Sequence, residues 1–89
     1  MAYAVEWTPR ALKALRRLSR DLQARAVAEA AALAINPRPP GSKPLKGKPT
    51  GRWSLRFADD WRLIYTIHDA ARLVLVIDVA NRGKVYRKR

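Results

Sequence analysis

The chain has 89 residues, enough for one domain but near the lower limit for folding without disulfides or a structural metal. It has no cysteine, which excludes disulfides, thiolate zinc sites and a cysteine nucleophile. Its single histidine argues against a histidine-built metal site and against a Ser-His-Asp triad, so we expect no metal and no cofactor. Lys and Arg number 19 and Asp and Glu only 7, and the net charge of +12 predicts nucleic acid or an acidic protein as partner.

The start of the chain has no basic leader followed by an apolar run, and no apolar stretch reaches ~18 residues. We therefore expect no secretory signal, no membrane span and a cytoplasmic location. A hydrophobic fraction of 48% is typical of a globular chain.

The first predicted elements are a short strand and a helix. Large side chains alternate with Ala and Glu from Tyr3 to Trp7, which indicates a strand. Thr8 and Pro9 are typical of a helix start, a hydroxyl N-cap followed by proline at the first helical position. This helix is predicted to run to about Leu18.

A second helix is predicted from a cap at Ser19 or Asp21 to about Ile35, where Asn36 and Pro37 end it. It is rich in alanine, the strongest helix former, and its small side chains allow close packing. The two helices are expected to form a helical hairpin.

Residues 36–51 hold five of the six prolines and three of the four glycines, so we expect no regular structure there. An interdomain linker is the alternative, but neither flank is long enough to be a domain. The segment is interpreted as an ordered, basic surface loop that carries Arg38, Lys43, Lys46 and Lys48.

The remainder predicts strands. Residues 53–57 and 61–68 are joined by a turn at 58–60, and a turn at 69–72 leads to residues 73–79. The near-continuous apolar run at 73–79 is typical of a central strand covered on both faces. Residues 81–83 break the pattern, and 84–86 can return as an edge strand. The order β-α-α-β-β-β predicts one α+β domain over residues 1–89, a twisted, mostly antiparallel sheet packed against an N-terminal helical hairpin.

Three arginines interrupt the β half: Arg56, Arg62 and Arg82. Alternation directs Trp53, Leu55 and Phe57 to the core and leaves Ser54 and Arg56 on the other face. Arg62 follows the turn and can lie beside Arg56 across the hairpin. Any one of them is explained by a solvated face. Three on one sheet with few carboxylates indicate an anion site, since guanidiniums repel each other without an anion and bind phosphate well.

Tyr86 follows Arg82 by four residues, which allows two interpretations. It is either an amphipathic edge residue, or a phenol whose pKa falls below its usual ~10 in a cationic field and which transfers a proton or stacks on a base. His68 is interpreted as a surface or turn residue. Turn chemistry explains three acidic residues of the β half: Asp59, Asp60 and Asp69. No carboxylate pair is spaced for glycosidase or two-metal chemistry, and no glycine-rich phosphate loop is present.

In order and spacing the segments resemble the RelE/ParE superfamily of toxins from type II toxin–antitoxin systems, over nearly the whole chain. They are YAVEWTPRALKALRRL, NPRPPGSKPLKGKPTGRWSLRFADDWRLIYTIHD and VLVIDVANRGKVYRKR. The hairpin WRLIYTIHD is similar to the family's Y-R-[LV]-[IV]-Y pattern, and the closing R-x-x-x-Y also matches.

The resemblance implies a fold like that of small microbial ribonucleases and one of two activities. RelE-like members cut mRNA in the ribosomal A site, whereas ParE-like members act on DNA gyrase and lack the catalytic set. Carried over by position, the catalytic residues are Arg56, Arg62, Arg82 and Tyr86. Ser54 is a departure, because some members carry a lysine there.

These residue types suit metal-free RNA cleavage, in which the ribose 2′-OH attacks phosphorus and the 5′-oxygen leaves. Tyr86 would be the base, Arg56 and Arg62 would clamp the phosphate, and Arg82 would stabilise charge on the leaving side. The expectation is therefore a ribosome-dependent mRNA endonuclease. A gyrase-directed toxin and a plain basic nucleic-acid-binding module are the alternatives.

RNA contacts are expected from basic and polar side chains of the loop, the first hairpin strand and the first helix: Lys43, Lys46, Lys48, Arg52, Ser54, Arg10, Lys13 and Arg17. Phosphate contacts of this kind give affinity without sequence preference. The expected protein partner is an acidic antitoxin, bound at an exposed sheet edge or in the groove beside the helix from Pro9 to Leu18.

Overall fold

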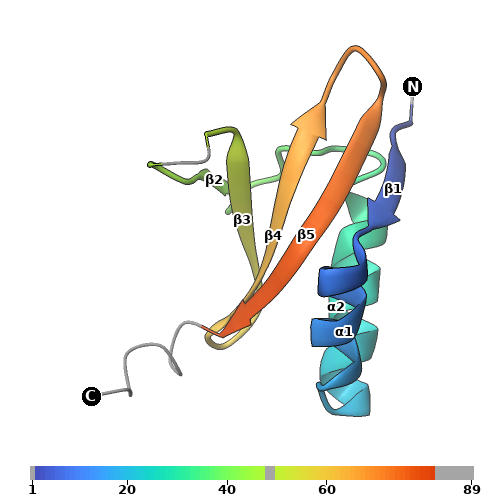
Figure 1. The fold of residues 1–89 in the computed structure, drawn as a ribbon, viewed down its shortest axis with the longest axis vertical. Coiled ribbons are helices and arrows are strands. Elements are labelled where there is room, and N and C mark those ends of the chain that lie inside the picture. Colours follow the sequence, from blue (N-terminus) through green and yellow to red (C-terminus); the bar gives the residue numbers. More distant parts are fainter. Residues whose placement is uncertain (1, 48–49, 82–89) are drawn as a thin grey trace.

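A twisted sheet and a helical hairpin form the two layers of the computed structural model, which describes residues 2–47 and 50–81 (Figure 1). Along the chain the elements are β1 (Ala4–Trp7), α1 (Pro9–Arg16), α2 (Arg20–Ala32), β2 (Lys43–Pro44), β3 (Arg52–Ala58), β4 (Trp61–His68) and β5 (Leu73–Asn81). The predicted α+β class and helical hairpin are confirmed.

Both helices begin at the caps that the sequence predicts. The Thr8 hydroxyl accepts a hydrogen bond from the Ala11 amide at 3.1 Å, and Pro9 opens α1. The Ser19 hydroxyl accepts from the Leu22 amide at 3.3 Å, so Ser19 rather than Asp21 caps α2. The helices end two to three residues earlier than predicted, because each last turn tightens into bonds to the third residue back.

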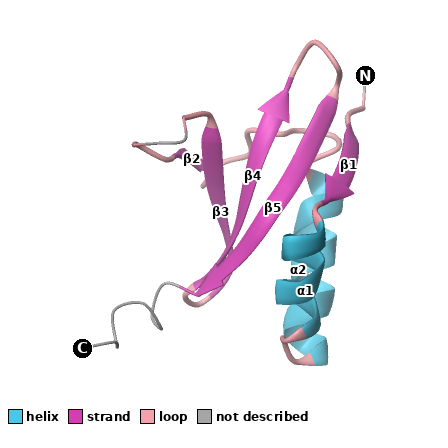
Figure 2. Cartoon of the chain, in the orientation of Figure 1, coloured by secondary structure: helices cyan, strands magenta, loops and turns pink. Residues whose placement is uncertain are grey.

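The strand order is β1-β5-β4-β3-β2 (Figure 2). β1 pairs with β5 in parallel, and the other neighbouring pairs are antiparallel, so the sheet is mostly antiparallel as predicted. The first strand of the chain therefore lies beside the last described one, with both helices between them in sequence. In Figure 1 the helices lie on the β1–β5 side of the sheet.

Two expectations about the strands are wrong. Lys43 and Pro44 were expected in irregular structure but form β2, pairing with Ser54 and Trp53. An edge strand tolerates a proline because its missing N–H can face away from the ladder. β5 is central, as predicted, but not covered on both faces: Val74, Val76 and Val79 are buried, and the residues between them are only half-buried.

The core lies between the hairpin and one face of the sheet. Its buried side chains come from both helices, from the residues just after each helix and from three strands: Ala11, Leu18, Ala26, Ala30, Leu33, Leu55, Phe57, Ala58, Leu63, Tyr65, Val74, Val76 and Val79. Alanines at the helix positions let the hairpin approach closely. Alternation along β3 and β4 then directs the intervening polar side chains to the opposite face.

Candidate functional site

The sheet face opposite the core carries the polar side chains, and we call it the open face. It is defined by alternate residues of three strands: Arg52, Ser54 and Arg56 on β3, Arg62, Ile64 and Thr66 on β4, and Asp78 and Ala80 on β5. Of these, Arg56 is exposed, Ser54 is buried, and the others are half-buried.

Arg56 and Arg62 are direct cross-strand partners on the open face. Directly opposed residues of an antiparallel pair have Cβ atoms about 5 Å apart, so two positive charges share one small area. The Nε atom of Arg62 is buried and has no hydrogen-bond partner among the described residues. Within residues 2–47 and 50–81 neither guanidinium forms an ion pair with a carboxylate.

This arrangement of two arginines destabilises the folded chain unless an anion binds between them. Like charges directly opposite each other destabilise a strand pair, and a buried cationic N–H without a partner costs about 1–3 kcal/mol or more. A phosphate between the two side chains removes both penalties, because its oxygens accept paired N–H donors from guanidinium groups. The pair is therefore suited to hold a phosphate.

The predicted RNA-binding residues of the β half lie along the same face. Lys43 on β2 pairs with Ser54 and is exposed, and Arg52 pairs with Thr66 and is half-buried. Lys46 is exposed in the loop that follows β2. Ser54 is only 3% exposed, so its side chain offers almost no surface to a nucleic acid.

The basic residues of α1 lie at the border of this face. Arg10 forms an ion pair with Asp78, with 3.4 Å between a terminal guanidinium nitrogen and Oδ2. Lys13 and Arg17 follow at helical spacing on the same side of the helix and are exposed. These side chains extend the basic surface from the sheet to the hairpin.

Three predicted site residues lie outside the described residues: Lys48, Arg82 and Tyr86. The edge strand expected at 84–86 also lies outside them. His68 is exposed, as predicted, with Nε2 at 2.9 Å from the Thr66 hydroxyl. Among the residues described, no group of three or more His, Cys, Asp and Glu is arranged to hold a metal ion.

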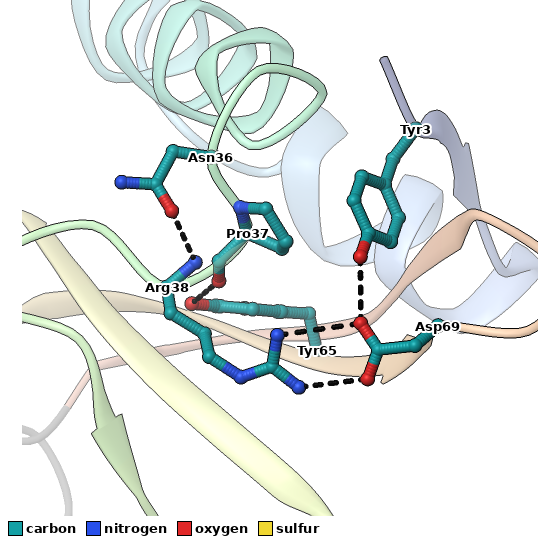
Figure 3. A network of polar contacts seen from close by, with 6 residues as sticks. All are labelled: Tyr3, Asn36, Pro37, Arg38, Tyr65 and Asp69. Atoms are coloured by element: carbon teal, nitrogen blue, oxygen red, sulfur yellow. Dashed lines mark hydrogen bonds and ion pairs between the residues drawn. The ribbon is translucent and has the colours of Figure 1, made fainter. Parts of the chain in front are cut away.

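Arg38 and Asp69 form a polar network that the sequence does not reveal (Figure 3). Arg38 donates to both carboxylate oxygens of Asp69, at 3.3 and 2.9 Å, and the Tyr3 hydroxyl donates to Oδ1 at 2.6 Å. Hydrogen bonds from Arg38 and then Tyr3 lower the pKa of Asp69 to about 2. The Arg38 guanidinium also lies 5.5 Å from the Trp53 ring centroid.

This network joins the basic loop to β1 and to the β4–β5 turn. Arg38, which the sequence places in a basic surface loop, is held by Asp69, and Asp69 is more than a turn residue. The nearby Tyr65 hydroxyl donates to the Pro37 carbonyl at 2.9 Å, and burial raises the pKa of Tyr65 (Figure 3). The only sequence signals are an arginine after a helix end and an aspartate in a distant turn, which do not identify each other as partners.

No described helix is both long and apolar enough to cross a membrane. Residues 5–86 match the family model described as ParE toxin of type II toxin–antitoxin system, parDE. A search of curated proteins gave no match.

Solved structures of toxin–antitoxin proteins are similar over nearly the whole chain. The toxin–antitoxin complex RelBE2 from Mycobacterium tuberculosis matches with a TM-score of 0.77 and 32% identity, over 92% of this chain and 100% of that one. The intact E. coli RelBE toxin–antitoxin complex matches with a TM-score of 0.75 and 27% identity, over 90% and 96%. A mutant E. coli toxin RelE in complex with an antitoxin RelBc peptide matches with a TM-score of 0.78 and 27% identity, over 99% and 94%.

Proposed function

The chain belongs to the ParE toxin family of type II toxin–antitoxin systems, within the RelE/ParE superfamily, and we propose that it is a ribosome-dependent mRNA endonuclease. The observation that carries this proposal is the Arg56–Arg62 pair on the open face, with a buried Arg62 Nε atom that lacks a hydrogen-bond partner within residues 2–47 and 50–81. A scissile phosphate supplies the missing acceptor.

In the proposed reaction the ribose 2′-oxygen forms a bond to phosphorus while the bond from phosphorus to the 5′-oxygen breaks. A base takes the 2′ proton and the departing 5′-oxygen is protonated, which leaves a 2′,3′-cyclic phosphate and a 5′-hydroxyl. Arg56 and Arg62 clamp the non-bridging oxygens and stabilise the charge that grows on them. We assign the base to Tyr86 and the stabilisation of leaving-side charge to Arg82, as the family resemblance implies.

Ribosome docking is assigned to the basic surface around the open face, supported by the exposure of Lys43, Lys46, Lys13 and Arg17. The same proposed set includes Lys48, Arg52 and Arg10. Ser54 is buried, so we assign it the role of supporting the neighbouring side chains. Phosphate contacts position the toxin without reading sequence. The ribosome would then orient the mRNA over the arginine pair, which compensates for a site with few catalytic groups.

An acidic antitoxin is the proposed protein partner, and cytoplasm is the proposed location. The net charge of +12 favours fast encounter with an acidic segment. The helical hairpin and the segment just after it expose apolar side chains that can anchor an amphipathic helix: Leu12 at 36%, Val27 at 47% and Ile35 at 80%. β1 and β2 are the edges where an extended peptide could add a strand.

Gyrase inhibition is the second candidate, and the match to a ParE family model favours it. The two activities differ in target, so one pair of assays separates them. A reconstituted translation reaction with primer extension detects cuts in ribosome-bound mRNA. A supercoiling reaction with purified gyrase detects broken or relaxed DNA.

The decisive comparison uses Arg62→Gln with Arg25→Gln as a matched control, since Arg25 is an exposed arginine of α2. We expect codon-phased cuts from the wild type and from Arg25→Gln and none from Arg62→Gln. Gyrase-dependent DNA breaks without mRNA cuts would establish the second candidate. If neither product appears, the remaining interpretation is a basic nucleic-acid-binding module.

A further inference from the structure

A pocket adjoins the arginine pair on the open face. It has a volume of about 480 Å³, room for one nucleobase, and its lining comes from α1 and three strands: Arg10, Arg52, Ile64, Ile77, Asp78 and Ala80. Ala80 is the direct cross-strand partner of Arg62, and Asp78 is the partner of Ile64. The pocket therefore lies directly beside the Arg56–Arg62 pair on the open face.

The spacing along β5 matches the dimensions of a nucleotide. Asp78 and Ala80 are two positions apart on a strand, which places the row of Asp78 about 7 Å from the row of the arginine pair. This is comparable to the reach from phosphate to base within one nucleotide. A phosphate held by Arg56 and Arg62 brings a neighbouring base to the pocket.

The lining combines an apolar floor with a single carboxylate. Ile64, Ile77 and Ala80 are half-buried and offer surface on which a base can pack. Asp78 Oδ1 accepts the Val79 amide at 2.8 Å, and Oδ2 lies 3.4 Å from Arg10. An ionised carboxylate accepts about four hydrogen bonds, so further donors can be bound.

A carboxylate repels phosphate, so Asp78 does not serve the polyanion contacts of this face. Nor is it needed to hold α1 against the sheet, since the Thr8 amide already donates to the Val76 carbonyl at 3.0 Å. Arg10 is 80% exposed, and an ion pair of this kind contributes little to stability. The position of Asp78 is explained by recognition of a group rich in N–H donors.

We propose that this pocket binds guanine next to the scissile phosphate, an inference that rests on the proposed nuclease function. Guanine presents two adjacent donors, N1–H and N2–H, to the oxygens of Asp78, and its O6 can accept from Arg10. Uracil places carbonyl oxygens on both sides of its only N–H, and adenine and cytosine each present an acceptor beside the amino group. Reading of this edge is the usual mode for unpaired RNA bases.

The test is primer extension on ribosome-bound mRNAs in which one position beside the cut is G, A, C or U. A bidentate contact discriminates by about 1–3 kcal/mol, so the wild type should favour guanine by about fivefold or more. Asp78→Asn should lose that preference, and Asp60→Asn, in the exposed β3–β4 turn, should keep it. A merely structural role of Asp78 would change total cleavage but leave the base distribution unchanged, and that result overturns the inference.

A binding measurement decides the inference independently of catalysis. We expect guanosine monophosphate to bind the wild type more tightly than uridine monophosphate and Asp78→Asn to bind the two alike. If no mRNA is cut but this preference is present, the nuclease proposal fails and the pocket assignment stands. Equal affinities in the wild type overturn the pocket assignment whatever the cleavage assay shows.

Discussion

At the scale of single residues, Arg56 and Arg62 show a conflict between stability and function. They occupy directly opposed positions on β3 and β4, and within the part of the chain that the structure describes the buried Arg62 Nε atom has no hydrogen-bond partner. A protein selected only for stability would replace one of them. Retention of both is explained if the anion that relieves the repulsion is the substrate.

This conflict predicts that Arg62→Gln raises the melting temperature while it removes activity. Loss of the repulsion and of the buried cationic donor should increase stability by about 1 kcal/mol in low salt. Inorganic phosphate should then raise the melting temperature of the wild type more than that of the variant, because only the wild type binds it well. Thermal melts with and without phosphate measure both effects, and Arg25→Gln serves as the control. A variant that melts below the wild type and responds equally to phosphate contradicts the assignment.

Asp69 predicts an acid-dependent loss of stability. Its pKa in the folded chain is about 2, below the unfolded value of about 3.9, because Arg38 and Tyr3 donate to the ionised form. The ionised Asp69 therefore stabilises the folded chain at pH values above the unfolded pKa, and this stabilisation is lost as the pH falls from about 4 to about 2. In thermal melts across this range, Asp69→Asn should show a shallower decline than the wild type. Asp60→Asn should follow the wild type, and an unchanged slope in Asp69→Asn would show that the network contributes nothing.

At the scale of elements, local signals explain what the sequence predicts. The caps at Thr8 and Ser19 and the alternation along β3 and β4 depend on neighbours within a few residues, so they can be read without the fold. The Arg56–Arg62 pairing is also local, because a short turn sets the register of the hairpin. Two of the four predicted catalytic residues, Arg56 and Arg62, can therefore be placed side by side from the sequence alone.

Contacts between distant segments are not visible in this way. The Arg10–Asp78 pair depends on the placement of α1 beside β5, which follows from the parallel pairing of β1. β2 depends on β3 to give Lys43 and Pro44 a partner. Neither relation leaves a periodic pattern, so the pocket beside the arginine pair had no sequence signal.

The Tyr65 side chain on β4 forms a hydrogen bond to the loop after α2, and we expect this bond to contribute measurably to the free energy of unfolding. The side chain is 0% exposed, and the bond to the Pro37 carbonyl has a length of 2.9 Å. Tyr65→Phe leaves that carbonyl without its partner and should lower the free energy of unfolding by about 1–3 kcal/mol. Urea denaturation measures the change. Tyr3→Phe removes an exposed hydroxyl bond and should cost less, and the reverse order would refute the assignment.

At the scale of the whole molecule, the net charge of +12 predicts salt-dependent ribosome binding. Lys43→Glu combined with Lys46→Glu should weaken association and flatten the dependence of affinity on salt. The matched control reverses two exposed arginines of α2, Arg20 and Arg25, which lie away from the open face. Binding to purified ribosomes at several salt concentrations gives the slopes. Equal slopes for the wild type and the lysine double variant would make these lysines ordinary solvated residues.

The pairing of β1 with β5 has a consequence for the stage of synthesis at which the toxin can become active. β1 is synthesised well before β5 and finds its sheet partner only when Leu73–Asn81 has been made, and β5 also supplies Val74, Val76 and Val79 to the core. Contacts between such distant segments form late, because the intervening chain must close before they are gained. A nascent chain that stops before β5 lacks the central strand, so it cannot assemble the open face. If the open face is the active site, as proposed, interrupted synthesis yields inert fragments and toxicity requires a completed sheet.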